Sequence, residues 1–252
     1  MAASINSSPV HHERDLLGQT VLVMGGSSGI GLETARLARA RGADIILTAR
    51  NPDRLHRAGL ELGASIAAFD ATDFDRLGRF FDALPAPIDH LLVTGLGRHY
   101  TPPTEFDLDA ARRHVDAHLL LPLQAARHTA TKVRPGGTLL FIGSTSGRRT
   151  AAGPALITAL TAALPAMTKT LALEVAPVRV NLIAAGFVGT PLPASLPGDQ
   201  IDEHREQLRA TLPIGHVVGP ADIAALAVHL MTNTAMTCAT FDIDGGQQLV
   251  DG

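Results

Sequence analysis

The stretch Thr20–Arg36, TVLVMGGSSGIGLETAR, decides the fold of this chain. A short apolar run ends in glycines spaced G-x-x-x-G-x-G, and a helical pattern follows directly. A strand, a glycine-rich turn and a helix in this order aim free backbone N–H groups at a phosphate. Gly25 would allow a sharp turn, Gly29 a close approach to a pyrophosphate, and Gly31 tight packing of the helix on the sheet. The stretch therefore predicts a dinucleotide-binding turn, whose other contact residues are Ser27, Ser28 and Ile30.

Composition restricts the class of protein. The chain has 252 residues, 46% of them apolar, which suits one large α/β domain. The net charge is −3 and no basic run occurs, so nothing indicates binding to nucleic acid or to an anionic membrane. The eleven His residues are scattered along the chain, and no metal site is expected. The single Cys238 cannot form an internal disulfide, which suits a reducing cytoplasm.

The ends of the chain also carry expectations. Residues 1–15 contain no apolar signal core and are expected to form a disordered tail. Residues 16–252 are expected to form a single domain, because no low-complexity linker interrupts them. No apolar run is judged long enough to cross a bilayer. We therefore expect a soluble, cytoplasmic protein.

Strand-like and helix-like segments alternate along the chain. This alternation predicts a Rossmann-like, doubly wound α/β fold: a seven-stranded parallel sheet with helices on both faces. The strands are expected at Val21–Val23, Asp44–Ala49, Ser65–Phe69, Asp89–Thr94, Thr138–Gly143, Val178–Ala184 and Thr240–Ile243. After the glycine turn, helices are expected at Pro52–Leu62, after a Thr72 cap, and at Ala110–Lys132, Pro154–Glu174, Glu203–Arg209 and Pro220–Met231.

Several features together resemble the short-chain dehydrogenase/reductase family. They are the glycine turn, Asp70, Ser144, Arg179-Val180-Asn181 and the terminal Asp244-Gly245-Gly246. The likeness extends from Leu17 to Val250 and includes the order and spacing of the elements. It implies a nicotinamide dinucleotide cofactor and a small-molecule substrate. By the same resemblance, the remaining cofactor-binding residues are Asp70, Ala71, Gly95, Gly186, Val188 and Thr190. An ordinary strand-ending role for Asp70 stays open.

The residues after the second strand bear on the choice of cofactor. Members that prefer NAD place an acid there to bind the ribose hydroxyls. Here Ala49 occupies that position and Arg50 follows it. A guanidinium pairs well with a 2′-phosphate, so we expect NADP, with NAD less favoured. The alternative interpretation is that Arg50 is a solvated residue.

The catalytic residues of the family are largely missing. Its spacing places the Tyr-x-x-x-Lys pair at Ile157 and Thr161, and its active-site Asn at His118. Ile157 has no proton to transfer, and Thr161 carries no positive charge. Ser144 matches the family's Ser after the fifth strand. Three of the four catalytic positions are therefore changed.

Other residues are candidates to replace the missing proton donor. Tyr100 is the only tyrosine in the sequence and lies in the loop expected to frame the substrate pocket. His118 is an acid available near neutral pH. Arg148, close after Ser144, is expected to face the same space. Each has a structural alternative: a loop anchor for Tyr100, a core hydrogen bond for His118 and a solvated charge for Arg148.

Two functions follow from these residues. The first is an NADP-dependent oxidoreductase that acts on a small or medium organic carbonyl, imine or enone, with Ser144, Tyr100 and His118 as catalytic residues. The second is a cofactor-binding member of the family whose catalysis is lost or repurposed to a non-redox step. The apolar helices at Ala110–Lys132 and Pro154–Glu174 also favour a homotetramer, with a homodimer next, since the family commonly pairs these helices.

Overall fold

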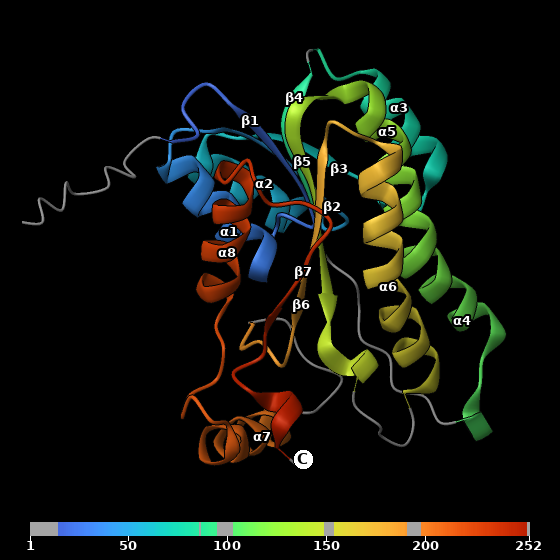
Figure 1. Cartoon of the computed structure of the whole chain (residues 1–252), viewed down its shortest axis with the longest axis vertical. Helices are drawn as coiled ribbons and strands as arrows, with labels where there is room; N and C mark the ends of the chain where they lie inside the picture. Colours follow the sequence, from blue (N-terminus) through green and yellow to red (C-terminus); the bar gives the residue numbers. More distant parts are fainter. Residues whose placement is uncertain (1–14, 86, 95–102, 149–153, 191–197, 251–252) are drawn as a thin grey trace, which may run out of the picture.

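The computed structural model of the chain describes residues 15–85, 87–94, 103–148, 154–190 and 198–250. Seven parallel strands form one sheet in the order β3-β2-β1-β4-β5-β6-β7 (Figure 1). The strand order reverses between β1 and β4, which is where doubly wound folds bind their ligands. The predicted doubly wound, seven-stranded parallel sheet is confirmed.

The observed elements follow the predicted alternation closely. The strands are β1 (Thr20–Met24), β2 (Asp44–Ala49), β3 (Ser65–Ala68), β4 (Ile88–Val93), β5 (Val133–Ser144), β6 (Arg179–Ala185) and β7 (Thr240–Ile243). The α-helices are α1 (Gly29–Ala40), α2 (Pro52–Leu62), α3 (Phe74–Asp82), α4 (Leu108–Val115), α5 (Leu121–Lys132), α6 (Ala155–Glu174), α7 (Gly198–Thr211) and α8 (Pro220–Thr232). Three 3-10 turns complete the described part, at Pro103–Glu105, Thr145–Arg148 and Gln247–Leu249.

The sheet separates two hydrophobic cores. Successive residues of a strand point to opposite faces, so Val21 and Val23 enter one core while Leu22 and Met24 enter the other. The first core is closed by α1, α2 and α8, and the second by α3, α5 and α6. Figure 1 shows these two groups of helices on opposite sides of the sheet. The helices thus cover both faces, as the buried apolar strands require.

Cap residues fix where two helices begin. Asn51 accepts a hydrogen bond from the Arg54 backbone N–H at 2.8 Å, and Pro52 occupies the first turn of α2. The predicted Thr72 cap of α3 is wrong. Asp73 is the cap and accepts from the Arg76 N–H, while the carboxylate of Asp70 holds Thr72. An Asp fills this role better than Thr does because its oxygens carry a full charge.

The predicted long helix Ala110–Lys132 is continuous but not uniform. A π-helical segment, Asp116–Leu120, joins α4 to α5. Pro122 follows directly and has no N–H to donate to a residue four positions earlier, which favours local rewinding. This segment carries His118 and contacts α6.

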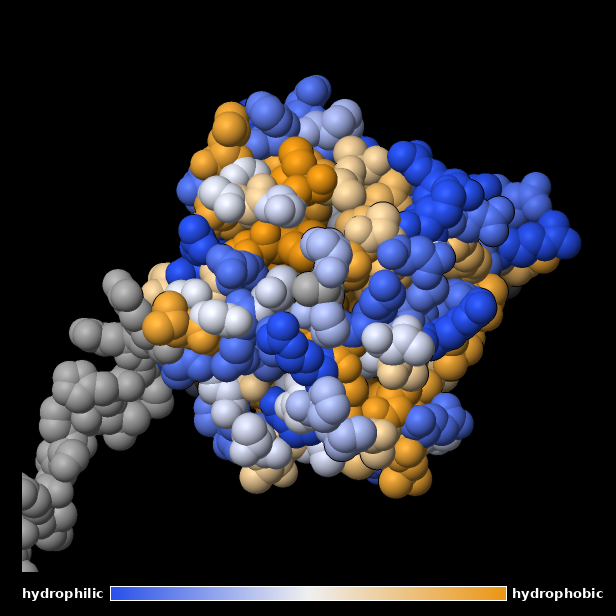
Figure 2. All heavy atoms as spheres, turned by 90° about the horizontal axis from the view of Figure 1, so that it is seen from above, coloured by the Kyte–Doolittle hydropathy of each residue, from blue (hydrophilic) through white to orange (hydrophobic). Residues whose placement is uncertain are grey.

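One helix departs from the expectation about membrane-spanning length. By length and composition alone, α6 passes the test for crossing a bilayer, with a mean hydropathy of 1.4. Its buried residues, including Leu160, Leu164 and Leu171, belong to the face that packs on the protein. Figure 2 shows a view from above in which apolar patches are separated by polar side chains. In this fold α6 packs one face on the sheet, and 39% of the apolar window is buried.

Candidate functional site

The candidate site lies at the carboxyl ends of the strands. Ser144, Ala185 and Ile243 end β5, β6 and β7 and pair in one row across the sheet. Met24 and Val93 end β1 and β4 in the same way. All strands are parallel, so the segments that follow them leave the sheet at one edge. This arrangement brings the glycine turn, Ser144 and Gly186 to the same edge.

The glycine turn is held by its neighbours on both sides. The backbone N–H groups of Gly25 and Gly26 donate to the Thr48 carbonyl at 2.8 and 3.1 Å. Gly25 has a φ of +87°, and a Cβ there would lie 2.7 Å from the Thr94 hydroxyl. A Cβ on Gly31 would lie 2.4 Å from the Gly25 carbonyl oxygen. Side chains at these positions would force the first turn of α1 away from β1.

The start of α1 is suited to an anion. The first backbone N–H groups of a helix have no intrahelical partner, and they gather partial positive charge. Ser28 is the N-cap residue, yet its side chain makes no capping hydrogen bond, and the first turn contains no acidic residue. Within the described residues, the hydroxyls of Ser27 and Ser28 remain available to a ligand.

A second segment approaches the turn from β6. A Cβ on Gly29 would lie 3.3 Å from the Thr190 methyl group, so these two predicted cofactor residues are neighbours. The Gly189 N–H donates to the Val218 carbonyl at 2.9 Å, and the Thr190 N–H donates to the Val188 carbonyl at 2.7 Å. The two segments therefore touch at Gly29 and Thr190, where a side chain on residue 29 would press on the Thr190 methyl group, and together they form the cradle of the candidate site.

The other predicted cofactor residues differ in what they do. Arg50 is exposed and makes no hydrogen bond or ion pair among the described residues, so its guanidinium is free to meet a phosphate. The Asp70 carboxylate accepts from the N–H and hydroxyl of Thr72 at 3.0 and 2.8 Å, which supports the strand-ending interpretation for this side chain. Ala71 is half-buried beside it. Gly95 lies outside the described residues.

The two positions to which the resemblance assigns the Tyr-Lys pair hold no ionisable group. Ile157 and Thr161 are 6% and 5% exposed on the inner face of α6. The Thr161 hydroxyl donates to the Ile157 carbonyl at 2.8 Å and lies 3.4 Å from the Ser146 hydroxyl. Gly147 lets the Thr145–Arg148 turn lie against α6, since a Cβ there would be 2.7 Å from the Ala162 backbone nitrogen. This surface is packed, and the Thr161 hydroxyl is hydrogen-bonded within the protein.

Ser144 keeps a hydroxyl at the end of β5. Its oxygen accepts a hydrogen bond from the Ser146 backbone N–H at 3.1 Å. That bond orients the oxygen and leaves its proton without an acceptor among the described residues. Ser144 can therefore donate a hydrogen bond to a substrate oxygen, but it has no neighbouring base in the described structure.

His118 is a neutral side chain with one nitrogen committed. It is 2% exposed, and its Nδ1 lies 3.0 Å from the His114 carbonyl oxygen, so this nitrogen carries the hydrogen. Burial lowers its pKa below the ordinary value, although the hydrogen bond to His114 opposes the shift. The Nε2 atom is then a hydrogen-bond acceptor at neutral pH. The geometry favours His118 as an acceptor or base and not as the acid expected from the sequence.

Of the two other proposed donors, the structure describes Arg148. Arg148 pairs with Asp242 on β7 and donates to the Gln248 side chain at 3.3 Å, which favours a structural role for its guanidinium. Tyr100 lies outside the described residues. Gly186 has a packing reason to be glycine, because a Cβ there would lie 2.6 Å from the Asp244 Cβ.

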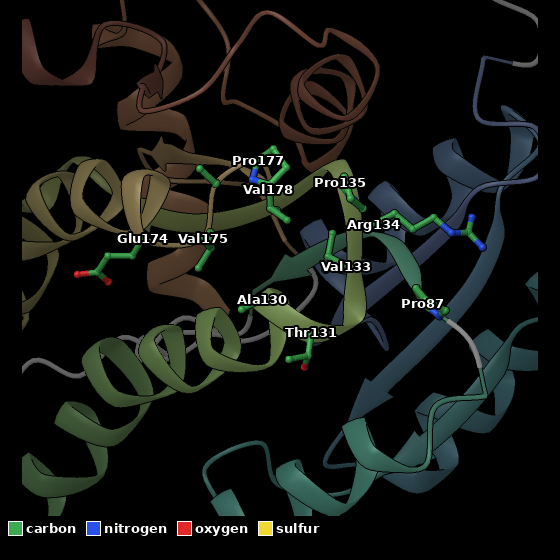
Figure 3. A pocket seen from close by; sticks show the side chains of 11 residues that line it. Pro87, Ala130, Thr131, Val133, Arg134, Pro135, Glu174, Val175, Pro177 and Val178 are labelled. Carbon is green, nitrogen blue, oxygen red and sulfur yellow. The ribbon is translucent and has the colours of Figure 1, made fainter.

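A separate hollow lies at the opposite edge of the sheet. Figure 3 shows that it is lined by the end of α5, the start of β5 and the segment from Glu174 to Val178. Its volume is about 330 Å³. Arg134 points from its rim and pairs with Asp89 at 3.2 Å. The hollow lies at the start of β5, whereas Ser144 lies at the end of that strand. The hollow is therefore not part of the candidate site.

Two glutamines that the sequence analysis did not single out also contact the site segments. The Gln247 side chain accepts from the Phe187 N–H, and Gln248 contacts Arg148. Their only sequence signal is position, directly after Asp244-Gly245-Gly246.

The fold and the glycine turn together define a dinucleotide-binding protein of the doubly wound α/β class. The sequence profile described as enoyl-(acyl carrier protein) reductase matches residues 25–248. The chain belongs to the short-chain dehydrogenase/reductase family of oxidoreductases.

Relatives match the chain over nearly its whole length. It is 28% identical to short-chain dehydrogenase/reductase ATR9 of Stachybotrys chlorohalonatus, over 91% of this chain and 96% of that protein. It is 29% identical to cis-4-hydroxycyclohexanecarboxylate dehydrogenase of Sinomonas cyclohexanicum, over 92% and 97%. A small-chain dehydrogenase solved in complex with NADPH has a TM-score of 0.79 and 26% identity, with 92% of this chain and 99% of that one covered.

Proposed function

We propose that this protein is an NADP-dependent oxidoreductase with a non-standard active site, acting on a small or medium organic carbonyl, imine or enone. The observation that carries this proposal is the glycine turn at the start of α1, which Thr190 approaches at Gly29, in a fold whose Ile157 and Thr161 carry no ionisable side chain. The NADPH complex of a related dehydrogenase supports the cofactor, and the named dehydrogenase relatives support a small organic substrate.

The residues of this chain fit the cofactor. Gly25, Gly29 and Gly31 would let a pyrophosphate approach the start of α1, and the Val188–Thr190 segment would hold the nicotinamide end. Arg50 would pair with the 2′-phosphate. When bound, the cofactor supplies a hydride. What the protein itself must supply is a fixed orientation for the substrate and a proton or a hydrogen bond at the substrate atom that gains charge.

Calorimetric titration with NADPH and NADH tests the cofactor. We expect a micromolar dissociation constant for NADPH, on the order of about 1–10 μM, and weaker binding of NADH. Arg50→Gln is expected to reduce the preference for NADPH by about tenfold, because one charge-assisted contact is lost. Arg127→Gln, an exposed Arg on α5, is the matched control and should leave both affinities unchanged. Absence of NADPH binding, or tighter binding of NADH, would overturn this assignment.

The chemistry rests on Ser144, Tyr100 and His118. Ser144 would donate a hydrogen bond to the substrate oxygen, and Tyr100 would supply the proton and regain one from water. Neutral His118 would accept a hydrogen bond through Nε2. With a turned-over substrate in hand, Tyr100→Phe should lower kcat by about tenfold or more, as expected for loss of a general acid. Thr161→Ala should change kcat less than twofold. Equal losses in the two variants would contradict this division of roles.

A second function is favoured by the same α6 surface. Ile157 and Thr161 offer no acid, and the lowered pKa of His118 withholds another. The protein would then bind the nucleotide while its catalysis is lost or repurposed to a non-redox step. Persistent NADPH fluorescence in the presence of carbonyl, imine and enone substrates, with binding intact, would favour this second function.

We also propose that the protein is a cytoplasmic homotetramer, with a homodimer as the next candidate. Among the leucines of the Ala110–Lys132 and Pro154–Glu174 segments, Leu121, Leu160, Leu164 and Leu171 are buried in the fold, whereas Leu120 and Leu123 are 40% and 43% exposed. Exposed small residues continue this surface along α6, at Ala155, Ala159, Ala162 and Ala166. Light scattering should give the mass of four or two chains, and Ala162→Arg should reduce it. A monomeric wild-type protein would refute the assembly.

A further inference from the structure

The segment Asp242–Gln248 forms a rigid turn beside the candidate site. It begins on β7, which is paired with β6, and so leaves the sheet next to Gly186. The buried Asp244 carboxylate accepts from the backbone N–H groups of Gly246 and Gln248 at 2.9 and 3.1 Å. Gly245 and Gly246 both have positive φ and pack against the residues that follow α7. This turn is therefore fixed by its own hydrogen bonds and by its neighbours.

Gln247 connects the turn to the segment after β6. Its side-chain oxygen accepts the Phe187 backbone N–H at 2.8 Å. The approach depends on Gly186, because a Cβ there would lie 2.7 Å from this same oxygen. Phe187 is followed directly by Val188–Thr190, the segment that meets Gly29 across the cradle. The Gln247 side chain thus holds the point at which the chain leaves β6 and enters the Val188–Thr190 segment.

Gln248 connects the turn to the segment after β5. Its side-chain oxygen accepts from Arg148 at 3.3 Å, and its side-chain nitrogen donates to the Asp242 carboxylate at 3.2 Å. Arg148 also pairs directly with Asp242. Arg148 ends the 3-10 turn that begins one residue after Ser144. The three polar side chains therefore form one closed cluster between β7 and the Ser144 segment.

We propose that Gln247 and Gln248 are positioning residues that fix the two walls of the site independently: Gln247 holds the Phe187–Thr190 wall, and Gln248 with Arg148 holds the Ser144 wall. This inference rests on the proposed function for its effect on catalysis, but its structural part does not. The side chains of the adjacent glutamines contact different loops. A single substitution can therefore remove the contact that holds one wall and leave the contact that holds the other.

The Gln247 half is tested with two variants that differ in one property. Gln247→Met has no acceptor for the Phe187 N–H, whereas Gln247→Glu keeps a carboxylate oxygen in its place. Hydrogen–deuterium exchange of the free protein should show at least tenfold faster exchange at the Phe187 amide in the Met variant, with the Leu182 amide in β6 as internal reference. The Glu variant should stay within about twofold of wild type.

Cofactor affinity gives the functional readout of the same pair. The NADPH dissociation constant should rise at least fivefold in Gln247→Met and less than twofold in Gln247→Glu, while Gln207→Met on exposed α7 serves as control. Equal behaviour of the Met and Glu variants, or unchanged exchange in Gln247→Met, would overturn the inference. If wild-type protein fails to bind NADPH, the proposed function falls, and amide exchange alone still decides whether Gln247 holds this wall.

The Gln248 half predicts a different pattern. Gln248→Met and Arg148→Met should speed exchange of the Thr145–Gly147 amides at least fivefold and leave the Phe187 amide unchanged. With a turned-over substrate, they should lower kcat severalfold and leave the NADPH dissociation constant within twofold. Loss of NADPH affinity equal to that of Gln247→Met would refute independent walls, because it would show that the turn acts as one unit.

Discussion

The protein is expected to lose stability between pH 7 and pH 5 through one buried histidine. His90 on β4 is 3% exposed, and both ring nitrogens are within hydrogen-bond distance of partners: Thr138 at 2.9 Å and Gln19 at 2.6 Å. The side-chain amide oxygen of Gln19 requires a donor, so Nε2 of His90 carries the hydrogen. Nδ1 of His90 then accepts from the Thr138 hydroxyl. Two charged neighbours oppose each other here, since Asp89 favours protonation of His90 and Arg179 disfavours it. Burial dominates and lowers the pKa of His90 to about 4.

The direction and size of the effect follow from this pKa. The unfolded chain binds a proton near the ordinary pKa of 6.5, but the folded protein does so only near 4. Between these values the unfolded state carries more protons, so the free energy of unfolding falls as the pH falls. Integrated from pH 7 to pH 5, the loss is about 2 kcal/mol, which is a large part of the stability of a typical domain. His118 and His128, whose pKa values are also lowered by burial, act in the same direction.

Urea unfolding at pH 5, 6 and 7 measures this loss. His90→Gln has no titrating ring, so its free energy of unfolding should fall about 2 kcal/mol less over this range than that of wild type. His56→Gln, at an exposed position on α2, should follow the wild-type curve. Parallel pH dependence of wild type and His90→Gln would refute the reasoning.

Four further substitutions test the packing. Gly31→Ala should destabilise the protein by about 2 kcal/mol in thermal unfolding and abolish NADPH binding, because its Cβ meets a backbone oxygen. Gly78→Ala has open space around it and should instead stabilise α3 by about 0.5–1 kcal/mol in the same assay. Arg179→Met should lower the free energy of unfolding by about 3 kcal/mol or more in urea, because the buried guanidinium donates to carbonyls at Gly136 and around the end of α8. A decrease under about 1 kcal/mol would contradict this reasoning. Thr168→Val should raise stability by about 1 kcal/mol in the same assay, since the buried Thr168 hydroxyl has no partner among the described residues, and a decrease would show that a partner was missed.

Much of the fold could be predicted from local sequence signals. The bounds of β2, α2 and β7 match because each end carries a clear signal, such as Asn51-Pro52 at the start of α2. β5 was predicted too short: Pro135-Gly136-Gly137 indicates a turn locally, yet Val133 pairs with Ile88 and extends the strand. That pairing joins residues 45 positions apart, and periodicity within a short window carries no information about it.

In the candidate site, too, the residues fixed by local geometry could be predicted, and the contacts between distant residues could not. Backbone-determined residues such as Gly25 and Gly31 were predictable, since only glycine suits their geometry. The partners of Arg148 were not, because Asp242 lies 94 residues away and either a solvated charge or a substrate contact would fit the same sequence. Gln247 was missed for a related reason: a glutamine after a glycine turn has no periodic or compositional signature.

The two cores on either side of the sheet have a consequence for how such a protein diverges. The glycine turn leads into α1, which packs in the core with α2 and α8. His118, Ile157 and Thr161 all belong to the helices of the other face. Because the sheet keeps these faces apart, mutations that remodel the reacting surface need not disturb the nucleotide cradle. The architecture therefore lets one face of the sheet change its side chains while the other face keeps the packing that shapes the glycine turn.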